Sequence, residues 1–411
     1  MNAGLSRHGG GGYLSPAPRR AAANPYTNRI PLSFRDCPLT APTTPKPVRE
    51  WAPRVWEGAD YFTWVRLLAR NRFAVQPPFW YIAGIASCVT FGQTVLRWLQ
   101  HALHGEAVAR TRIAEPPLFV LGHWRTGTTL LHELLILDER FTSPSTLQCL
   151  MPCNFLLLEG VMKKYGNFFL PDKRPMDNMG FGWDRPQEDE FALALLGAPS
   201  PYYDFAFPHR PPLFPGSLDL TGLTASQLRQ WKTTFVRFLK AVTYRDPRRL
   251  VLKSPPHTAR VPVLLELFPD AKFVHIRRDP YTLFASTVKL WRAMAERHGL
   301  QRPDTSPALD EKVFRDFELI HARYEEGKKL IPAGHLVEVR YEDLVADMPG
   351  VVKGVYDGLD LGGFDAVRPK LEAYVADHKG YRTNAHAVTA EQKARIAARW
   401  GDLIRAQGYA V

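Results

Sequence analysis

Short apolar runs alternate with amphipathic segments along the chain from about residue 117 onward. Four of these runs predict buried strands, at residues 118–121, 249–253, 272–278 and 335–341. The segments around them have helical spacing. In the clearest, 226–244, Leu228, Trp231 and Phe235 recur on one face. Further helices are expected at residues 190–196, 257–268, 280–298 and 308–330 and through most of the rest of the chain. Strands that alternate with helices are typical of a parallel sheet covered by helices.

The first apolar run ends in a loop that contains two glycines. Residues 122–129 read Gly-His-Trp-Arg-Thr-Gly-Thr-Thr, and a run of leucines with helical spacing follows. The interval from Gly122 to Gly127 copies the P-loop template. The first amides of a helix have no intrahelical acceptor and can bind an anion. The template lysine is replaced by Thr128, however, and the positive charge lies inside the loop at Arg125. The sequence therefore predicts an anion-binding loop that differs from that of an ATPase.

The expected fold is α/β, a P-loop-type three-layer sandwich with a central parallel sheet and an N-terminal helical extension. Residues 1–50 contain a run of four glycines and many prolines, and we expect a disordered basic tail. Residues 51–112 form the helical, aromatic-rich extension, and residues 113–411 the α/β domain. The extension includes 18 uncharged residues at 79–96, a marginal length for a membrane span. Polar residues dilute this run and favour a buried helix or one at a membrane surface.

The overall charge limits the classes of partner. The chain carries 53 Lys and Arg against 41 Asp and Glu, a net charge of +12. Seven Lys or Arg against two acidic residues place +5 of this in residues 1–50. The basic body suits an anionic small ligand, although nucleic acid or acidic lipid would fit almost as well. We expect no nucleic-acid partner. The chain start lacks the apolar segment of a secretion signal, and we expect a cytoplasmic protein, with membrane association through residues 51–112 as an alternative.

Four cysteines in 411 residues exclude a disulfide scaffold. Cys149 and Cys153 are four residues apart, but no matching His or Cys pair lies nearby in the sequence. We expect buried thiols there and no metal site.

Three of the predicted strands end in basic or polar groups. These are the loop after the first strand, Lys253 after the second and Arg278 after the third. Because the carboxyl ends of parallel strands meet at one edge of a sheet, we expect these groups to lie close together. Their charge predicts a ligand that is rich in phosphate.

In this combination and order, the motifs resemble those of sulfotransferases that use 3′-phosphoadenosine 5′-phosphosulfate (PAPS), over roughly residues 115–411. The loop is similar to the Gly-His-Trp-Arg-[Ser/Thr]-Gly-Thr-Thr loop of a bacterial branch of that family. The resemblance implies that the 5′-phosphosulfate binds Arg125, Thr126, Gly127, Thr128 and Thr129. It implies that the 3′-phosphate binds Arg278 and Ser286, which have the family's eight-residue spacing. Lys253-Ser254-Pro255 matches a further family motif, and Lys379 and Gly380 resemble a loop that closes over the nucleotide. No metal is implied.

The implied reaction moves a sulfuryl group from PAPS to a hydroxyl or amine by in-line transfer. Arg125 and Lys253 are expected to stabilise the charge that develops on the bridging oxygen. The acceptor needs a base, and the first candidates are Glu188 and Glu190, followed by His257. These two carboxylates lie in an acidic trio at a predicted helix start, where stabilisation of the helix N-terminus is an equally good explanation.

Two other functions stay open at this point. A metal-dependent P-loop kinase would need the lysine that the loop lacks, and a nucleotide-binding protein on the same fold would bind without transfer. The acceptor is expected to be a small molecule, a lipid or a glycan. An aromatic loop at 199–215 either walls the acceptor pocket or packs in the core; its aromatic residues are Tyr202, Tyr203, Phe205, Phe207 and Phe214.

Overall fold

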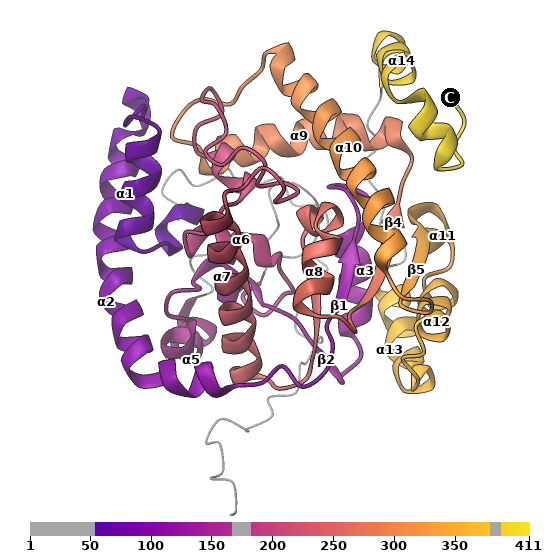
Figure 1. Ribbon diagram of the computed structural model, residues 1–411, viewed down its shortest axis with the longest axis horizontal. Coiled ribbons are helices and arrows are strands. Elements are labelled where there is room, and N and C mark those ends of the chain that lie inside the picture. The colour runs from indigo at the N-terminus through magenta and orange to yellow at the C-terminus, as the bar shows by residue number, and fades with distance from the viewer. Residues whose placement is uncertain (1–53, 167–181, 379–387) are drawn as a thin grey trace, which may run out of the picture. The chain divides into compact units, whose positions relative to one another are not determined.

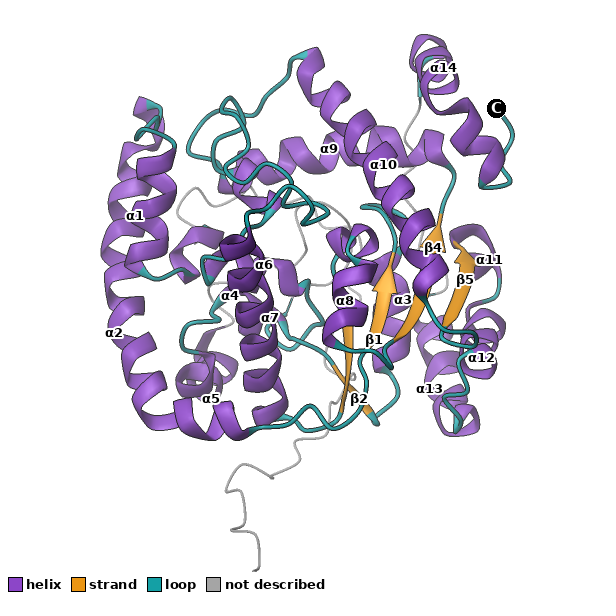
Figure 2. Cartoon of the chain, in the orientation of Figure 1, coloured by secondary structure: helices purple, strands orange, loops and turns teal. Residues whose placement is uncertain are grey.

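The computed structural model describes residues 54–166, 182–378 and 388–411. Its centre is a parallel sheet of five strands in the order β2-β3-β1-β4-β5 (Figure 2). The strands are β1 Leu118–Leu121, β2 Phe141–Thr142, β3 Arg249–Lys253, β4 Lys272–Arg277 and β5 Leu336–Arg340. All four predicted strands are confirmed. The sequence did not indicate β2, because it has two residues and pairs only with β3 at the sheet edge.

Helices cover both faces of the sheet (Figure 1). They are α3 Thr128–Ile136, α4 Thr146–Leu150, α5 Phe155–Tyr165, α6 Asp189–Leu195, α7 Ala225–Arg245, α8 Val261–Leu267, α9 Pro280–His298, α10 Pro307–Gly327, α11 Tyr341–Ala346, α12 Met348–Gly358, α13 Phe364–Asp377 and α14 Ala390–Ala406. Short 3₁₀ turns lie at η2 Val55–Gly58, η3 Pro77–Phe79, η5 Pro201–Phe205, η6 Pro255–Ala259 and η7 Lys328–Leu330.

Alternate residues of each central strand enter two separate cores, as the two-residue period of a strand requires. In β1, Phe119 and Leu121 pack with α7 and α8, whereas Leu118 and Val120 pack with α3, α12 and α13. All four side chains are fully buried. The expected three-layer α/β sandwich with a parallel sheet is thus confirmed.

The strand order reverses around β1. From β1 the chain runs to the edge strand β2, returns through β3 beside β1, and then crosses to β4 on the other side. Ligands of open α/β sheets bind outside the carboxyl ends of the strands at such a point. The register aligns Val120 of β1 with Lys253 and Leu121 with His275. The loop after β1, the end of β3 and the end of β4 therefore meet at one edge.

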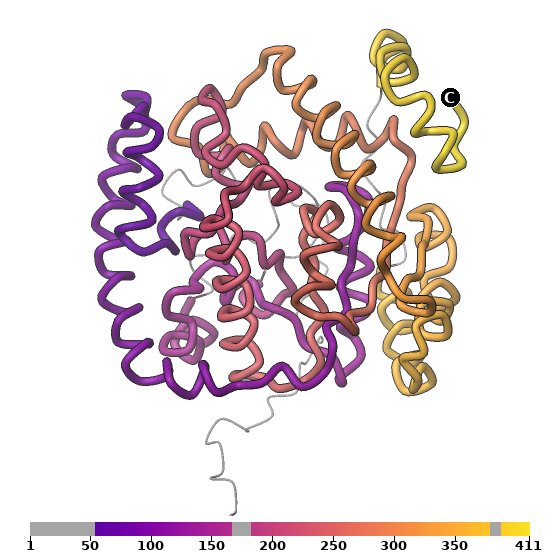
Figure 3. Tube along the Cα trace, in the orientation of Figure 1, coloured from indigo at the N-terminus to yellow at the C-terminus, as the bar shows by residue number. Residues whose placement is uncertain are grey.

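Two helices precede the sheet, as predicted for the N-terminal extension: α1 Tyr61–Arg70 and α2 Trp80–Arg110. Figure 3 shows them as adjacent indigo and violet coils. They pack against each other, and α2 also packs against α5 and α7. Trp64 of α1 is fully buried. The segment Pro77–Arg110 is long and apolar enough to cross a membrane, a criterion of length and composition that core helices of soluble proteins also meet. The domain boundary at residues 112 and 113 stays a prediction.

Some predictions concern residues outside the described ranges. These are the disordered tail at 1–50 and the nucleotide-closing residues Lys379 and Gly380.

Candidate active site

The loop after β1 has a conformation that two of its residues make possible. Arg125 and Gly127 both have left-handed backbone angles, with φ of 70° and 97°. A side chain at Gly127 would also overlap the ring of Tyr341, so glycine is required there on both counts. Gly127 is the N-cap of α3 and has no side chain to cap it. The first amides of α3 therefore receive no side-chain cap from this position, which suits the anion-binding role that the sequence predicts for the loop.

Three predicted phosphate-binding residues, from two distant parts of the sequence, lie together at this loop. The Arg125 Nε–H donates a hydrogen bond to Ser286 Oγ on α9, at 2.8 Å. Arg278, which follows β4, donates from its Nη1 to the Arg125 carbonyl at 3.0 Å. The Arg278 guanidinium also lies 4.1 Å from the centre of the Tyr341 ring. Two guanidinium groups and a hydroxyl are thus held at one place, an arrangement that suits phosphate or sulfate oxygens.

A second group of contacts joins the end of β3 to the start of α6. Lys253 Nζ lies 2.7 Å from Glu188 Oε1 and 3.4 Å from the Thr129 hydroxyl of the loop. The Lys253 side chain is 1% exposed and that of Glu188 is 13% exposed. Glu188 also accepts a hydrogen bond from the Tyr202 hydroxyl. The structure therefore brings the predicted base Glu188 and the predicted charge stabiliser Lys253 to the anion-binding loop.

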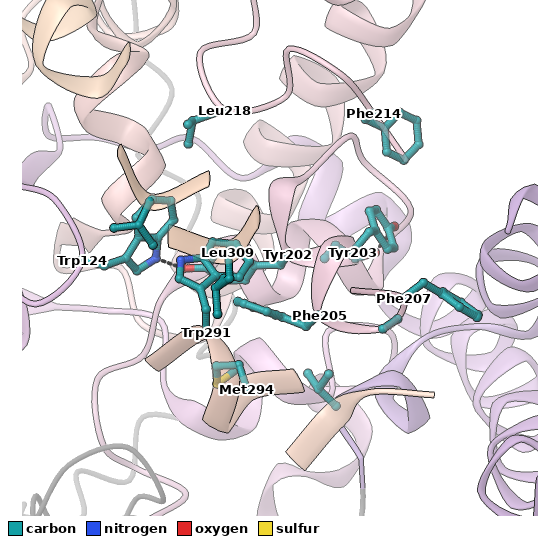
Figure 4. Close-up of a cluster of buried hydrophobic side chains, with 14 of the residues drawn as sticks. Trp124, Tyr202, Tyr203, Phe205, Phe207, Phe214, Leu218, Trp291, Met294 and Leu309 are labelled. Atoms are coloured by element: carbon teal, nitrogen blue, oxygen red, sulfur yellow. Dashed lines mark hydrogen bonds between the residues drawn. The ribbon is translucent and has the colours of Figure 1, made fainter. Parts of the chain in front are cut away.

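The aromatic loop at 199–215 packs against the anion-binding loop. Figure 4 shows Trp124, Tyr202, Phe205 and Trp291 gathered in one cluster, with the Trp124 indole N–H donating to the Tyr202 hydroxyl at 3.3 Å. Trp124 and Phe205 both contact Trp291, with ring centres 5.8 Å and 4.7 Å apart. The five aromatic side chains singled out in this loop are all buried. This burial favours a core-packing role, with Tyr202 also positioning Glu188.

Glu190 has a different environment from Glu188. Its carboxylate forms a two-fold ion pair with the Arg260 guanidinium, at 2.6 and 3.1 Å, and both side chains are fully buried. Arg260 also donates to the Leu218 and Ser217 carbonyls. A buried carboxylate that binds a guanidinium through both of its oxygens is poorly placed to accept a proton from a substrate. The geometry favours a structural role for Glu190.

Replacing Glu190 by Gln is expected to destabilise the fold by about 3–5 kcal/mol, because Arg260 would keep a buried charge without its partner. Urea unfolding of the purified chain measures this. The matched control is Glu266→Gln, since Glu266 pairs with Lys232 at the surface and its side chain is 62% exposed. That change should cost less than about 1 kcal/mol. If the Glu190→Gln variant is as stable as the unchanged protein but has lost sulfuryl transfer, Glu190 has a catalytic role instead.

His257 is also enclosed. Its Nε2 lies 2.7 Å from Asp189 Oδ2, and both side chains are fully buried. The rings of Phe119 and Phe235 surround the imidazole. Burial by itself would raise the pKa of Asp189, but His257 and then Ser254 lower it below its ordinary value. Asp189 is therefore a carboxylate that holds His257, and this geometry favours a structural role for both.

Two other histidines near the loop are neutral. Burial lowers the pKa of His123 to about 4. Burial and then the charge of Lys253 lower the pKa of His132 to about 3. His132 contacts the Val251 carbonyl at 3.2 Å, which fixes the ring in the core. Neither imidazole is placed as a base as well as Glu188.

Some residues of the site were not singled out from the sequence. Arg260 and Thr258 have no motif of their own, and Thr258 accepts the Gly122 N–H at 2.7 Å. The sequence could have indicated Thr258 and Arg260 only through their position a few residues after Lys253. Within the described ranges, no group of three or more His, Cys, Asp or Glu could hold a metal ion.

Comparison with known proteins identifies the family to which this chain belongs. Residues 116–366, more than half of the chain, match the sulfotransferase family. The chain belongs to this family. The omega-hydroxy-beta-dihydromenaquinone-9 sulfotransferase Stf3 of Mycobacterium bovis is 44% identical to this sulfotransferase over 361 residues, 88% of this chain and 92% of the relative. The Stf3 of Mycobacterium tuberculosis matches to the same extent. The resemblance inferred from the sequence is confirmed, and sulfuryl transfer is favoured over the kinase and the non-catalytic alternatives.

Solved sulfotransferases share the fold. Sulfotransferase STF9 from Mycobacterium avium superposes with a TM-score of 0.64 at 20% identity, over 86% of this chain and 93% of that one. Sulfotransferase STF1 from Mycobacterium tuberculosis superposes with a TM-score of 0.55 at 19% identity, over 84% and 94%. At this identity the likeness concerns the fold.

Proposed function

We propose that this sulfotransferase takes its sulfuryl group from PAPS and transfers it, without a metal ion, to the hydroxyl of a lipid-like small molecule. The observation that supports PAPS as the donor is the position of three side chains beside the N-terminus of α3. Arg125 contacts both Ser286 and Arg278 there. PAPS carries one anionic group on the 5′ carbon and one on the 3′ carbon of its ribose, and two neighbouring guanidinium groups suit such a donor. Arg125 with the loop amides would bind the 5′ group, and Arg278 with Ser286 the 3′-phosphate.

The proposed chemistry uses charges that the chain already holds in place. Glu188 takes the proton of the acceptor hydroxyl as the acceptor oxygen bonds to sulfur. The bond from sulfur to the bridging oxygen breaks, and its electron pair stays on the 5′-phosphate. Lys253 and Arg125, with the loop amides, stabilise that oxygen. Lys253 is suited to this role because it lies between Glu188 and Thr129 at the loop.

The acceptor is inferred from the relatives. Their name assigns them an omega-hydroxylated dihydromenaquinone, and they are 44% identical to this chain over nearly their whole length. We infer a long apolar molecule with a terminal hydroxyl as the acceptor here, rather than a glycan or an amine. The aromatic side chains of residues 199–215 are buried in the core, so the acceptor proposal rests on these relatives.

The test is a transfer assay with the full chain, PAPS labelled in its sulfate, and an omega-hydroxylated menaquinone. We expect a labelled lipid whose mass has increased by one SO₃, at the same rate with or without EDTA. Simple sugars and amines serve as competing acceptors. The donor proposal fails if transfer requires Mg²⁺ or if ATP replaces PAPS. The acceptor proposal fails if sugars or amines are sulfated faster than the lipid. A cytoplasmic location stays a prediction.

A further inference from the structure

Helix α2 carries its apolar side chains on the outside. Over about six turns its exposed face presents Tyr81, Ile85, Phe91, Val95, Trp98 and Leu103, each between 49% and 63% exposed. No charged residue lies on this face between Tyr81 and Leu103. Only 22% of the most apolar 18-residue window is buried. A surface helix of a soluble protein normally shows the opposite arrangement, with its apolar stripe toward the core.

Polar side chains in the middle of α2 point the other way, into the protein, and they have partners there. Thr90 and Thr94 are buried, and the Thr94 hydroxyl accepts the Tyr61 N–H at 2.9 Å. Gln93 accepts a hydrogen bond from Asn154, and Arg97 forms an ion pair with Asp60. The polar side of the helix is therefore fixed to α1 and the segment before α5, and a rotation that would bury the apolar face would break these contacts.

A basic cavity opens beside the apolar face. It has a volume of about 590 Å³ and lies among α1, α2, α5 and α7. Arg66, Arg97 and Arg237 line it against a single carboxylate, Asp60, which leaves a net charge of +2 with the histidines neutral. Phe62 and Trp98 line the same cavity and belong to the exposed apolar surface, since both are at least 60% exposed. Apolar and cationic surfaces are thus continuous.

We propose that α2 lies flat on an anionic lipid bilayer, with its apolar face in the acyl boundary and a phosphate headgroup in the cavity of Arg66, Arg97 and Arg237. Exposed Trp, Tyr and Phe beside arginine are the side chains that occupy a membrane–water interface. The contacts of Thr94 and Gln93 with the rest of the fold along one side of α2 favour a helix that lies on the bilayer rather than one that spans it. This inference does not depend on the donor or acceptor proposed above.

Charge favours the bilayer over a second copy of the chain. Two copies that met through this face would bring two cavities of net positive charge together, and like charges oppose association. An anionic bilayer complements the same cavity. Each arginine near an anionic surface strengthens binding by a factor of about five.

The decisive experiment is flotation of the full chain with vesicles of phosphatidylcholine alone or with added phosphatidylglycerol. We expect flotation with the anionic vesicles and little with the neutral ones. The double change Phe91→Gln and Trp98→Gln should abolish it, and Arg66→Gln should weaken it about fivefold. The matched control is Leu330→Gln on η7, where a leucine is 59% exposed outside this surface. Unfolding midpoints of all variants should stay unchanged, because the changed residues are exposed.

A probe on Cys88 separates the occupants of the face. Cys88 is exposed on α2, and Cys149 and Cys153 are buried. In a Cys37→Ser chain, an environment-sensitive dye on Cys88 should shift its emission to the blue when anionic vesicles are added. A dye already shifted in buffer, and unaffected by vesicles, would mean that another part of this chain or a second copy covers the face. That result, or equal flotation of the Phe91 and Trp98 double variant, would overturn the proposal.

Discussion

Replacing Glu188 by Gln is expected to lower kcat about 10²- to 10⁴-fold, the usual contribution of a general base. Glutamine keeps the size of the side chain and can still bond Tyr202, but it cannot accept the proton of the acceptor. Initial rates at saturating PAPS and lipid acceptor measure the effect. Binding of 3′,5′-diphosphoadenosine should be retained, since Glu188 contacts Lys253 and Tyr202 rather than Arg278 or Ser286.

Tyr202→Phe is the companion variant for this prediction. It keeps the ring in its cluster with Phe205 and removes only the hydroxyl that donates to Glu188. Its loss should be smaller than that of Glu188→Gln, because the carboxylate would still be held by Lys253. A Glu188→Gln enzyme with a normal kcat would show that another group takes the proton.

Replacing Arg278 by Ala is expected to remove the preference for a 3′-phosphate. A hydrogen bond to a charged group contributes about 1.5–3 kcal/mol, so affinity for 3′,5′-diphosphoadenosine should fall by a factor of roughly 10 to 150. Affinity for 5′-AMP should change little. Titration calorimetry with both nucleotides measures the difference.

Arg277→Ala is the matched control, because Arg277 is the adjacent residue of the same strand end and misses the family spacing to Ser286 by one residue. Its affinity for 3′,5′-diphosphoadenosine should stay within about twofold of the unchanged protein. Equal losses in the two variants would indicate a general effect of positive charge rather than a specific 3′-phosphate site.

The sheet could be predicted because its strands are apolar runs bounded by glycine or charge. Leu118–Leu121 is the clearest case, since it is buried on both faces and stops at Gly122. β2 could not be predicted, because Phe141 and Thr142 give too short a pattern to distinguish a strand from a loop. Its place in the sheet depends on the pairing with β3.

The proposed donor site could be predicted from motif spacing, whereas the choice among the candidate bases could not. Glu188, Asp189 and Glu190 are consecutive, yet they pair with three different residues of one short segment: Lys253, His257 and Arg260. Which carboxylate meets which partner depends on how α6 packs against the end of β3 and η6. No local pattern in the sequence contains that information. Two of the three candidate bases, Glu190 and His257, lie in buried pairs, and this geometry favours a structural role for them.

The pairing of Lys253 with Glu188 also has a consequence for the timing of the reaction. In the resting site the two charges cancel, and Lys253 has little net attraction to offer a departing oxygen. On the proposed mechanism, Glu188 becomes neutral when it receives the acceptor proton. Lys253, which is almost fully enclosed, then carries a positive charge next to Thr129 that Glu188 no longer balances. The bond between sulfur and the bridging oxygen would thus be activated chiefly when an acceptor is bound. This order would limit hydrolysis of PAPS in the absence of an acceptor.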